Sequence, residues 1–294
     1  MIHLSKAVIT AAGLGTRLLP SSKEIPKEMF PIFDLDESGS ICVKPVMHRI
    51  FENLYDIGFK NFCIIVGRGK RSIEDHFTPD RAFSILARDR VKPNMHNTLT
   101  GFYQKILDSK IFFINQPEPK GFGDAVLRAE TFVGDEHFLL HAGDDLVLSE
   151  GHGHLLRLLE VFKKYGGDMT ILAERVESPS QYGVIVGEPL SGDRYLMRVR
   201  DIVEKPAKPP SNIAVIGVYI LSPRIFKALR SIEPDERGEI QLTPALRKLL
   251  EDGGEGYAVL LREDEKRLDV GNPANYYRAL VESYNFCLKR IKRS

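Results

Sequence analysis

The sequence predicts an α/β fold built on a mixed, mostly parallel sheet with helices on both faces, and three observations support this. Short apolar, β-branched runs recur through the first half of the chain. Both faces of these runs are apolar, which is typical of parallel strands buried between helices. Stretches with helical periodicity lie between them, and this alternation predicts right-handed βαβ units.

The first predicted strand, 7–12, reads Ala-Val-Ile-Thr-Ala-Ala and stops at Gly13. Further runs in the first half share its character: 61–66, 110–115 and 137–141. In the second half, Gly, Pro and Ser residues separate the predicted strands 168–175, 182–188, 195–204, 214–221 and 257–261. These later strands are expected to cover or extend the first ones.

Three internal helices are predicted between the strands. The helix 46–57 places Ile50, Leu54 and Ile57 at spacings of three and four, and Gly58 is a suitable C-terminal stop. Stretches 123–132 and 153–165 resemble it. Segment 78–109 breaks this strand–helix pattern and is interpreted as an insertion.

A last helix is predicted to begin with Asn272 as N-cap and Pro273 as its first residue. Its apolar positions recur with helical spacing at Tyr277, Val281, Tyr284, Leu288 and Ile291. The basic run 289–293 is interpreted as a helix C-terminus whose charge suits the helix dipole, and not as a nucleic-acid-binding tail.

Composition excludes several classes of protein. The 294 residues carry 41 Lys and Arg against 40 Asp and Glu, a net charge of +1. Nucleic-acid and membrane-surface proteins are usually strongly basic, so neither partner is expected. No apolar run is long enough to span a bilayer, and the N-terminus lacks signal-peptide features. Three scattered Cys predict neither disulfides nor a zinc site, so a cytoplasmic location is expected.

A glycine loop follows the first strand. Residues 13–17, Gly-Leu-Gly-Thr-Arg, lie where α/β proteins bind nucleotides, and Arg17 adds a positive fork for phosphates. Leu18 replaces the third glycine of the dinucleotide fingerprint, and neither this loop nor 67–70 has Walker spacing. Taken alone, a glycine pair after a strand is also an ordinary tight turn.

The segment after this loop is basic and stiff. Lys23 and Lys27 lie four residues apart, and three prolines nearby make a continuous helix improbable. Such a segment suits a triphosphate, although two lysines are also found on any solvated loop.

At this point the residues resemble a known family. The run GLGTRLLPSSKEIPKEMFPI is similar to the N-terminal signature of bacterial UTP–glucose-1-phosphate uridylyltransferases, within the sugar-phosphate nucleotidylyltransferase superfamily. The resemblance continues in order through KPVMHRIFENLYDIG, QPEPKGFGDAVLRAE, AGDD, YGVI, VEKP, GEIQLTPAL and DVGN. It spans almost the whole chain and implies a nucleotide-diphospho-sugar transferase fold, Rossmann-like, in a single domain of residues 1–294.

The resemblance divides the domain into a nucleotide-binding part, about 1–150, and a sugar-phosphate-binding part, about 151–294. The implied nucleotide-binding residues are Ala12, Gly13, Leu14, Gly15, Thr16, Gln116 and Gly121. Gln116 would read the uracil edge, since an amide can pair with a donor–acceptor edge. Arg17 and Lys27 would be catalytic, with Lys27 on the α-phosphate.

The implied sugar-phosphate site contains Asp145, Gly183, Glu204 and Lys205, and the implied Mg²⁺ ligands are Asp144 and Asp269. Mg²⁺ takes one or two carboxylates together with substrate phosphates and water. Asp144 follows the predicted strand 137–141 and is expected at the carboxyl edge of the sheet. By themselves, Asp144 and Asp145 would also suit a plain turn, and Glu204 and Lys205 a surface ion pair.

The implied reaction converts UTP and glucose 1-phosphate into UDP-glucose and pyrophosphate, in a homodimer or homotetramer. Two alternatives remain. One is a dTTP-dependent nucleotidylyltransferase, and the other is a non-catalytic sugar-nucleotide sensor on the same fold. Gly238 and Pro244 replace acidic residues common in the family, which bears on details of the sugar pocket or the subunit contact. Segment 35–43 intrudes where the family usually passes directly from the proline loop to the next helix; it is expected to be a surface hairpin, in which Cys42 carries no chemistry.

Overall fold

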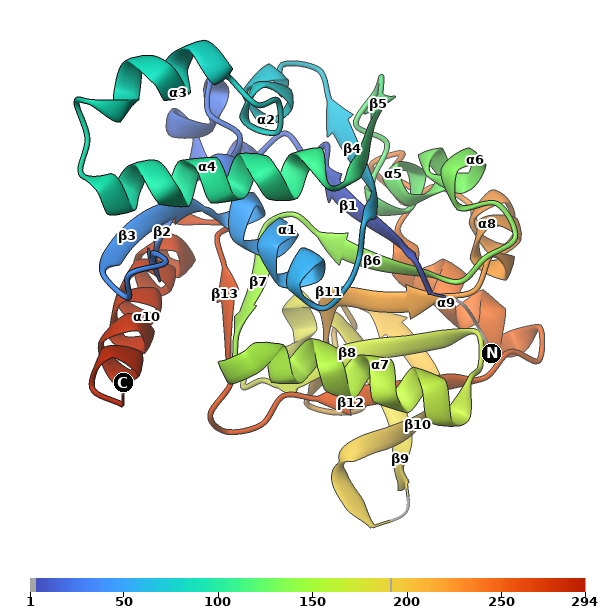
Figure 1. Ribbon diagram of the computed structural model, residues 1–294. Helices are drawn as coiled ribbons and strands as arrows, with labels where there is room; N and C mark the ends of the chain where they lie inside the picture. Colours follow the sequence, from blue (N-terminus) through green and yellow to red (C-terminus); the bar gives the residue numbers. More distant parts are fainter. Residues whose placement is uncertain (1–3, 191, 294) are drawn as a thin grey trace.

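One sheet organises the chain. The computed structural model describes residues 4–190 and 192–293, and nine strands within them form a continuous sheet in the order β5-β4-β1-β6-β11-β8-β12-β10-β9 (Figure 1). Residues 1–3, which belong to the N-terminal run on which the signal-peptide prediction rests, lie outside the described part. The strands are β1 Lys6–Ala11, β4 Asn61–Gly67, β5 Lys110–Gln116, β6 Phe138–Ala142, β8 Met169–Arg175, β9 Gly183–Leu190, β10 Asp193–Glu204, β11 Ile213–Leu221 and β12 Gly256–Leu260.

The sheet changes direction along its width. Strands β5, β4, β1 and β6 are parallel, with Ile9 of β1 between Ile64 and His141 of its two neighbours. Beyond them, β11 is antiparallel to both β6 and β8, β12 is parallel to β8, and β10 is antiparallel to β12 and β9. The mixed sheet is confirmed, and each predicted strand agrees with an observed one to within two residues at either end.

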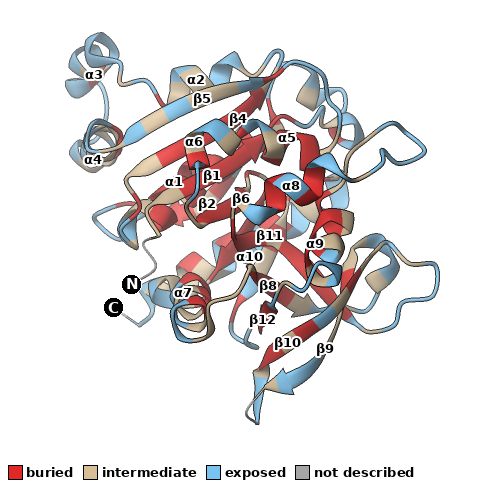
Figure 2. Ribbon diagram, turned by 90° about the vertical axis from the view of Figure 1, so that its right-hand side faces the viewer, coloured by how far each residue is buried: buried red, intermediate tan, exposed pale blue. Residues whose placement is uncertain are grey.

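Helices cover both faces of the sheet, as predicted (Figure 1). Along β1, Ala7 and Ile9 face one apolar core and Val8 faces the other. The first core is completed by α1 Val46–Asp56, α2 Arg71–His76, α4 Pro93–Leu107 and α7 Gly153–Tyr165. The second is completed by α5 Phe122–Arg128, α6 Glu130–Val133, α8 Arg224–Arg230 and α9 Leu242–Glu251. The central strands are therefore buried on both sides (Figure 2).

Two helix predictions need correction. The stretch 123–132 is not one helix, because the helix is interrupted at Ala129, between α5 and α6. Segment 78–109 is not an irregular insertion: in sequence it lies between β4 and β5 and contains α3 Arg81–Arg88 and then α4, which buries Phe102 and Ile106 in the first core. Its many Asn, Thr and His residues conceal the helical periodicity in the sequence.

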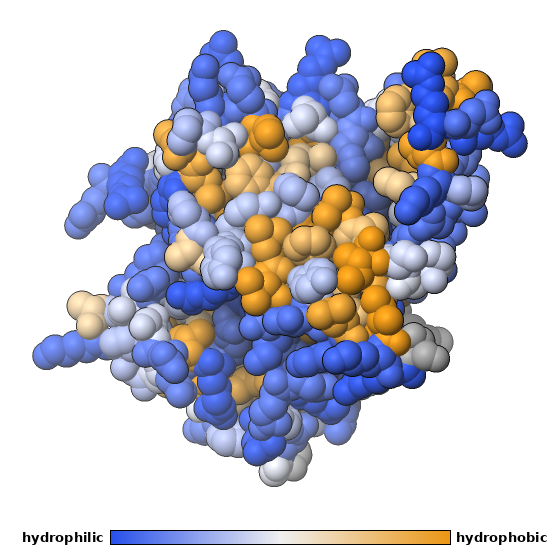
Figure 3. Space-filling model, turned by 90° about the vertical axis from the view of Figure 1, so that its left-hand side faces the viewer, coloured by the Kyte–Doolittle hydropathy of each residue, from blue (hydrophilic) through white to orange (hydrophobic). Residues whose placement is uncertain are grey.

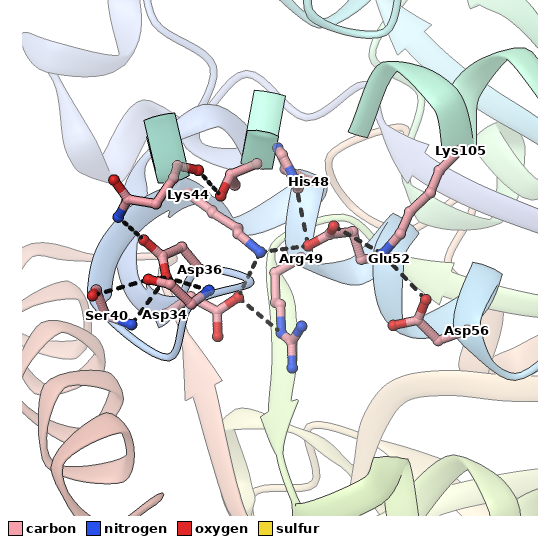
Figure 4. Close-up of polar contacts among 12 residues, drawn as sticks. Asp34, Asp36, Ser40, Lys44, His48, Arg49, Glu52, Asp56 and Lys105 are labelled. Atoms are coloured by element: carbon pink, nitrogen blue, oxygen red, sulfur yellow. Dashed lines mark hydrogen bonds and ion pairs between the residues drawn. The ribbon is translucent and has the colours of Figure 1, made fainter. Parts of the chain in front are cut away.

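The segment 35–43 lies in the predicted hairpin, formed by β2 Pro31–Leu35 and β3 Ile41–Pro45. The base of the hairpin is buried, however, and carries an ion-pair network. Lys44 Nζ lies 3.1 Å from Asp34 Oδ2 and 2.7 Å from Glu52 Oε2. Glu52 of α1 also pairs with Lys105 of α4, at 3.0 Å (Figure 4). This network fastens the hairpin and α4 to α1. Cys42 is half-buried, and burial raises the pKa of its thiol to about 11.

The last helix is confirmed as α10, Pro273–Ile291, and the Asn272 side chain caps it by accepting from the Asn275 N–H at 3.0 Å. Its buried residues are the small Ala279, Ser283 and Cys287. The apolar stripe noted in the sequence lies mostly outward instead, and Tyr277 is 69% exposed. Apolar side chains gather on this side of the molecule, which also carries the hairpin and α3 (Figure 3). No helix in the described ranges is long and apolar enough to cross a membrane.

Candidate active site

Two adjoining cavities open at the carboxyl ends of the parallel strands. The first, of about 490 Å³, lies over the loop that follows β1, and the second, of about 610 Å³, lies toward β9, β10 and β11. Residues of the β1 loop, the start of α5, the β6 end, the β10 end and the segment before α9 line both cavities: Thr16, Arg17, Phe122, Ala142, Asp144, Lys205 and Gln241. A ligand with two halves could therefore extend continuously from one cavity into the other.

The glycine loop forms one wall of the first cavity. All residues from Ala12 through Arg17 line it, so the structure brings together the whole predicted phosphate loop. Gly15 has a φ of +66°, a backbone conformation that favours glycine, and its carbonyl accepts a hydrogen bond from Ser22 Oγ at 2.7 Å. Instead of a helix, three short 3₁₀ turns follow, at Thr16–Leu18, Ser21–Lys23 and Lys27–Met29, as the prolines predict.

Lys27 lies in this cavity and forms an ion pair with Asp144, at the end of β6. Burial acts to lower the pKa of the Lys27 ammonium, but the carboxylates of Asp144 and Glu28 outweigh it and raise that pKa. Burial acts to raise the pKa of the half-buried Asp144 carboxyl, but Lys27 outweighs it and holds that pKa below its usual value. Glu28 is itself buried and pairs with Lys70 at 2.9 Å. Lys27 and Asp144 are thus both charged at neutral pH.

Gln116 ends β5 and reaches the opposite side of the first cavity. Its amide nitrogen donates to the Gly121 carbonyl at 3.1 Å and to Asp124 Oδ2 at 2.8 Å. Gly121 has a φ of +99°, and a Cβ there would lie 2.5 Å from the Ile240 carbonyl oxygen. Only glycine suits this contact, which joins the loop before α5 to the segment before α9.

The two predicted metal ligands come together through a second, two-stranded sheet. Strand β7, Asp145–Leu148, pairs antiparallel with β13, Lys266–Asp269, and Asp269 lies opposite Asp145 in the register. The neighbouring Asp144 and Asp269 both line the second cavity. Asp269 Oδ1 accepts from the Gly271 N–H at 2.7 Å, and Oδ2 accepts from Asn275 at 2.6 Å. These contacts orient the Asp269 carboxylate.

The predicted sugar-phosphate residues also line the second cavity: Asp145, Gly183, Glu204 and Lys205. The backbone of Lys205 has a φ of +39°, which is strained for a residue with a side chain. Its ammonium lies 2.7 Å from Glu204 Oε1. Strain held at a cavity wall is typical of functional positions.

Asp145 is held by a largely buried arginine. Arg267 binds both oxygens of the Asp145 carboxylate at 2.7 Å, and a third nitrogen lies 2.7 Å from Glu174. The two carboxylates more than offset the effect of burial and raise the pKa of Arg267 well above its ordinary value. The Gly217 N–H donates to Asp145 Oδ2 at 3.0 Å. Asp145 therefore fixes the wall of the second cavity.

Comparisons with known proteins agree with this arrangement. The sequence profile of the nucleotidyl transferase family matches residues 6–284. The chain belongs to the nucleotidyl transferase family. It is 37% identical over 298 residues to a UTP–glucose-1-phosphate uridylyltransferase of Pseudomonas aeruginosa, covering 99% of this chain and 98% of the relative. It is 40% identical to the UTP–glucose-1-phosphate uridylyltransferase YngB of Bacillus subtilis strain 168, covering 94% and 88%.

Solved structures give the same family. The crystal structure of a UDP-glucose pyrophosphorylase complexed with UDP-glucose matches with a TM-score of 0.81 and 34% identity, over 96% of this chain and 99% of that one. The nucleotidyl transferase fold inferred from the sequence is confirmed.

Sequence reasoning missed several cavity residues of this nucleotidyl transferase. Arg267 carries no motif signal of its own, and its position two residues before Asp269 was the sole clue. Glu239 and Gln241 line the first cavity and lie within the GEIQLTPAL run, where no single residue had been given a role. Asp124 does not line a cavity but contacts Gln116, which does; it also had no predicted role, although it lies within QPEPKGFGDAVLRAE.

Proposed function

We propose that this chain transfers a uridylyl group from UTP to glucose 1-phosphate and releases pyrophosphate. The observation that carries the proposal is the pair of adjoining cavities, with the glycine loop in one, the predicted sugar residues in the other, and Arg17, Asp144 and Lys205 lining both. The named activity of the full-length relatives supports it. We also infer that residues 1–294 act as one domain, which the single sheet from β5 to β9 supports.

In this proposal the glycine loop binds the triphosphate of UTP, and Gln116 and the backbone at Gly121 bind the base. Glu204 accepts hydrogen bonds from sugar hydroxyls, and Lys205 neutralises the sugar phosphate. Asp145 and Gly183 shape the wall beside the sugar.

No general base is needed. The nucleophile is a phosphate oxygen of glucose 1-phosphate, and because the second pKa of a phosphomonoester is about 6, it is largely ionised at pH 7. It attacks the α-phosphorus in line, and pyrophosphate leaves on the Arg17 side. The main obstacle is repulsion between two polyanions. Arg17, Lys27 and Lys205 reduce it, so catalysis consists of positioning and charge neutralisation.

We propose Mg²⁺ as the cofactor, held by Asp144 and Asp269. The donor set fits, since both are oriented carboxylates at one cavity and Mg²⁺ prefers oxygen ligands. Within residues 4–190 and 192–293 no cluster of three or more His, Cys, Asp or Glu could enclose a metal, so substrate phosphates would complete its coordination. When bound, the ion would neutralise phosphate charge.

The proposal includes a homodimer or homotetramer located in the cytoplasm. The exposed stripe on α10 supports an assembly, because apolar residues spaced alternately by four and three suit packing against another helix.

The test is a set of initial rates with purified protein. We expect pyrophosphate release from UTP that requires glucose 1-phosphate, with lower kcat/KM for dTTP and for galactose 1-phosphate. A preference for dTTP would favour the thymidylyl alternative. Absence of release with every nucleotide would favour the sensor alternative.

A further inference from the structure

The Gln116 amide is held in one orientation. Gln116 and Asp124 are each only 4% exposed, and the Gln116 amide nitrogen donates both to Asp124 Oδ2 and to the Gly121 carbonyl. An NH₂ group has two hydrogens, so both are used within the protein.

Chemistry removes the usual ambiguity between the oxygen and nitrogen of an amide. A backbone carbonyl can only accept a hydrogen bond, and so can an ionised carboxylate. The Asp124 carboxylate also accepts from the Arg128 guanidinium at 2.9 Å, and a guanidinium can only donate. The group of Gln116 that faces Asp124 and Gly121 must therefore be the NH₂, which leaves Oε1 for the first cavity that Gln116 lines.

An amide that presents its oxygen alone distinguishes two pyrimidines. Uracil carries a hydrogen on N3 and can donate it to Gln116 Oε1. Cytosine has no hydrogen on N3, and its lone pair there would face the lone pairs of the amide oxygen. A site built to accept a hydrogen bond rejects a group that cannot donate one.

We propose that Asp124 is a positioning residue that fixes the Gln116 amide with its oxygen toward the base, and so makes the site select uridine over cytidine triphosphate. This inference rests on the base-reading role proposed for Gln116. The geometry extends to Arg128, which pairs with Asp124, and to Gly121, whose backbone packs against Ile240 and whose carbonyl also accepts from the Ala125 N–H at 3.2 Å. Asp124 and Gln116 do not distinguish uracil from thymine, since both bases carry a hydrogen on N3.

Asp124→Asn is the sharpest test. Arg128 needs an acceptor, so the new amide turns its oxygen to Arg128 and its NH₂ to Gln116. This NH₂ opposes the Gln116 NH₂ and can donate to the Gln116 oxygen instead, so that only the Gly121 carbonyl still favours the original orientation. We expect the ratio of kcat/KM for UTP to that for CTP to fall about tenfold or more, the equivalent of one hydrogen bond to a charged group. Asp124→Ser serves as a second variant if the first does not fold, because a hydroxyl both donates and accepts.

Two comparisons separate positioning from general damage. Glu130→Gln removes another ion-paired carboxylate from the neighbouring helix and is expected to leave the UTP/CTP ratio unchanged. In a Gln116→Ala background, Asp124→Asn should not change the ratio further, because Asp124 acts through Gln116.

The outcomes are distinguishable. A normal UTP/CTP ratio in folded Asp124→Asn, or the same fall in the Gln116→Ala background, would overturn the positioning role. If Gln116→Ala itself leaves the ratio unchanged, the proposed base-reading role fails, and the positioning role fails with it.

Discussion

The ammonium of Lys27 forms an ion pair with the carboxylate of Asp144, a residue 117 positions later in the chain. Lys27 comes from a 3₁₀ turn after the glycine loop, and Asp144 from the turn after β6. Parallel pairing of β1 with β6 brings these two segments to the same edge of the sheet. The contact therefore joins the proposed catalytic lysine to the proposed metal ligand at the junction of the two cavities.

Lys27→Ala is expected to lower kcat about 100-fold or more while the protein still folds cooperatively, because the ammonium acts on charge that develops in the transition state. Steady-state rates and a thermal melt measure the two effects. Lys248→Ala is the matched control, since Lys248 is also ion-paired, with Asp252 at 2.6 Å on an exposed surface. Near-normal UDP-glucose formation by Lys27→Ala would contradict the assignment.

Asp144→Asn is expected to abolish Mg²⁺-dependent activity, because the neutral amide is a poorer ligand for a hard cation. Initial rates measured against Mg²⁺ concentration test this, with Asp252→Asn as control. An unchanged Mg²⁺ dependence would show that Asp144 does not hold the metal.

Lys205→Ala is expected to raise the KM for glucose 1-phosphate about tenfold or more, the cost of losing a hydrogen bond to a charged group. The KM for UTP should change much less. Substrate-saturation curves for both substrates give the comparison. A larger effect on UTP would move Lys205 from the sugar phosphate to the nucleotide.

The buried network at the hairpin base predicts a stability loss in acid (Figure 4). Although burial acts to raise the pKa of Glu52, its contacts with His48, Lys44 and Lys105 hold that pKa well below its ordinary 4.5. A carboxyl with a lowered pKa stabilises the fold above its unfolded-state pKa, and this contribution is lost as the pH falls below about 4.5.

The melting temperature of the wild type should therefore fall as the pH decreases from 5 to 3. Glu52→Gln should lower stability at pH 7 by about 1 to 3 kcal/mol, because buried Lys44 keeps its ion pair with Asp34 but loses its closer partner. The variant should also flatten the acid dependence. Equal slopes in the two proteins would exclude Glu52 as the source.

Val281→Glu is expected to dissociate the proposed assembly, because it places a charge in the exposed stripe of α10. Light scattering after size-exclusion chromatography measures the mass. Leu156→Glu, which changes an exposed apolar residue of α7, is the control and should leave the mass unchanged. A monomeric wild type would contradict the assembly itself.

Much of this architecture was predictable because β1, β4, β5 and β6 are apolar on both faces, and buried parallel strands require that pattern. Helix α4 was not predictable, since its polar residues and Gly101 obscure the helical periodicity. Its position also depends on the ion pair between Lys105 and Glu52. The outward direction of Tyr277 on α10 also depends on packing, because periodicity identifies a stripe and not what covers it.

The site divides in the same way. The glycine loop is a continuous run of residues directly after β1, so the sequence alone predicts that it lies at the carboxyl end of that strand. The role of Arg267 depends on contacts with Asp145 and Glu174, which are 122 and 93 residues away, and no local pattern records them. The positioning role proposed for Asp124 likewise depends on its contact with the Gln116 amide, which the sequence alone does not show.

The most direct test of the proposed activity is a ³¹P NMR time course of the wild-type protein with UTP, glucose 1-phosphate and Mg²⁺. The account predicts that UDP-glucose and pyrophosphate signals grow at equal rates, and that neither grows when glucose 1-phosphate is omitted. Pyrophosphate or inorganic phosphate formed from UTP without the sugar phosphate, or no reaction with both substrates present, would contradict it.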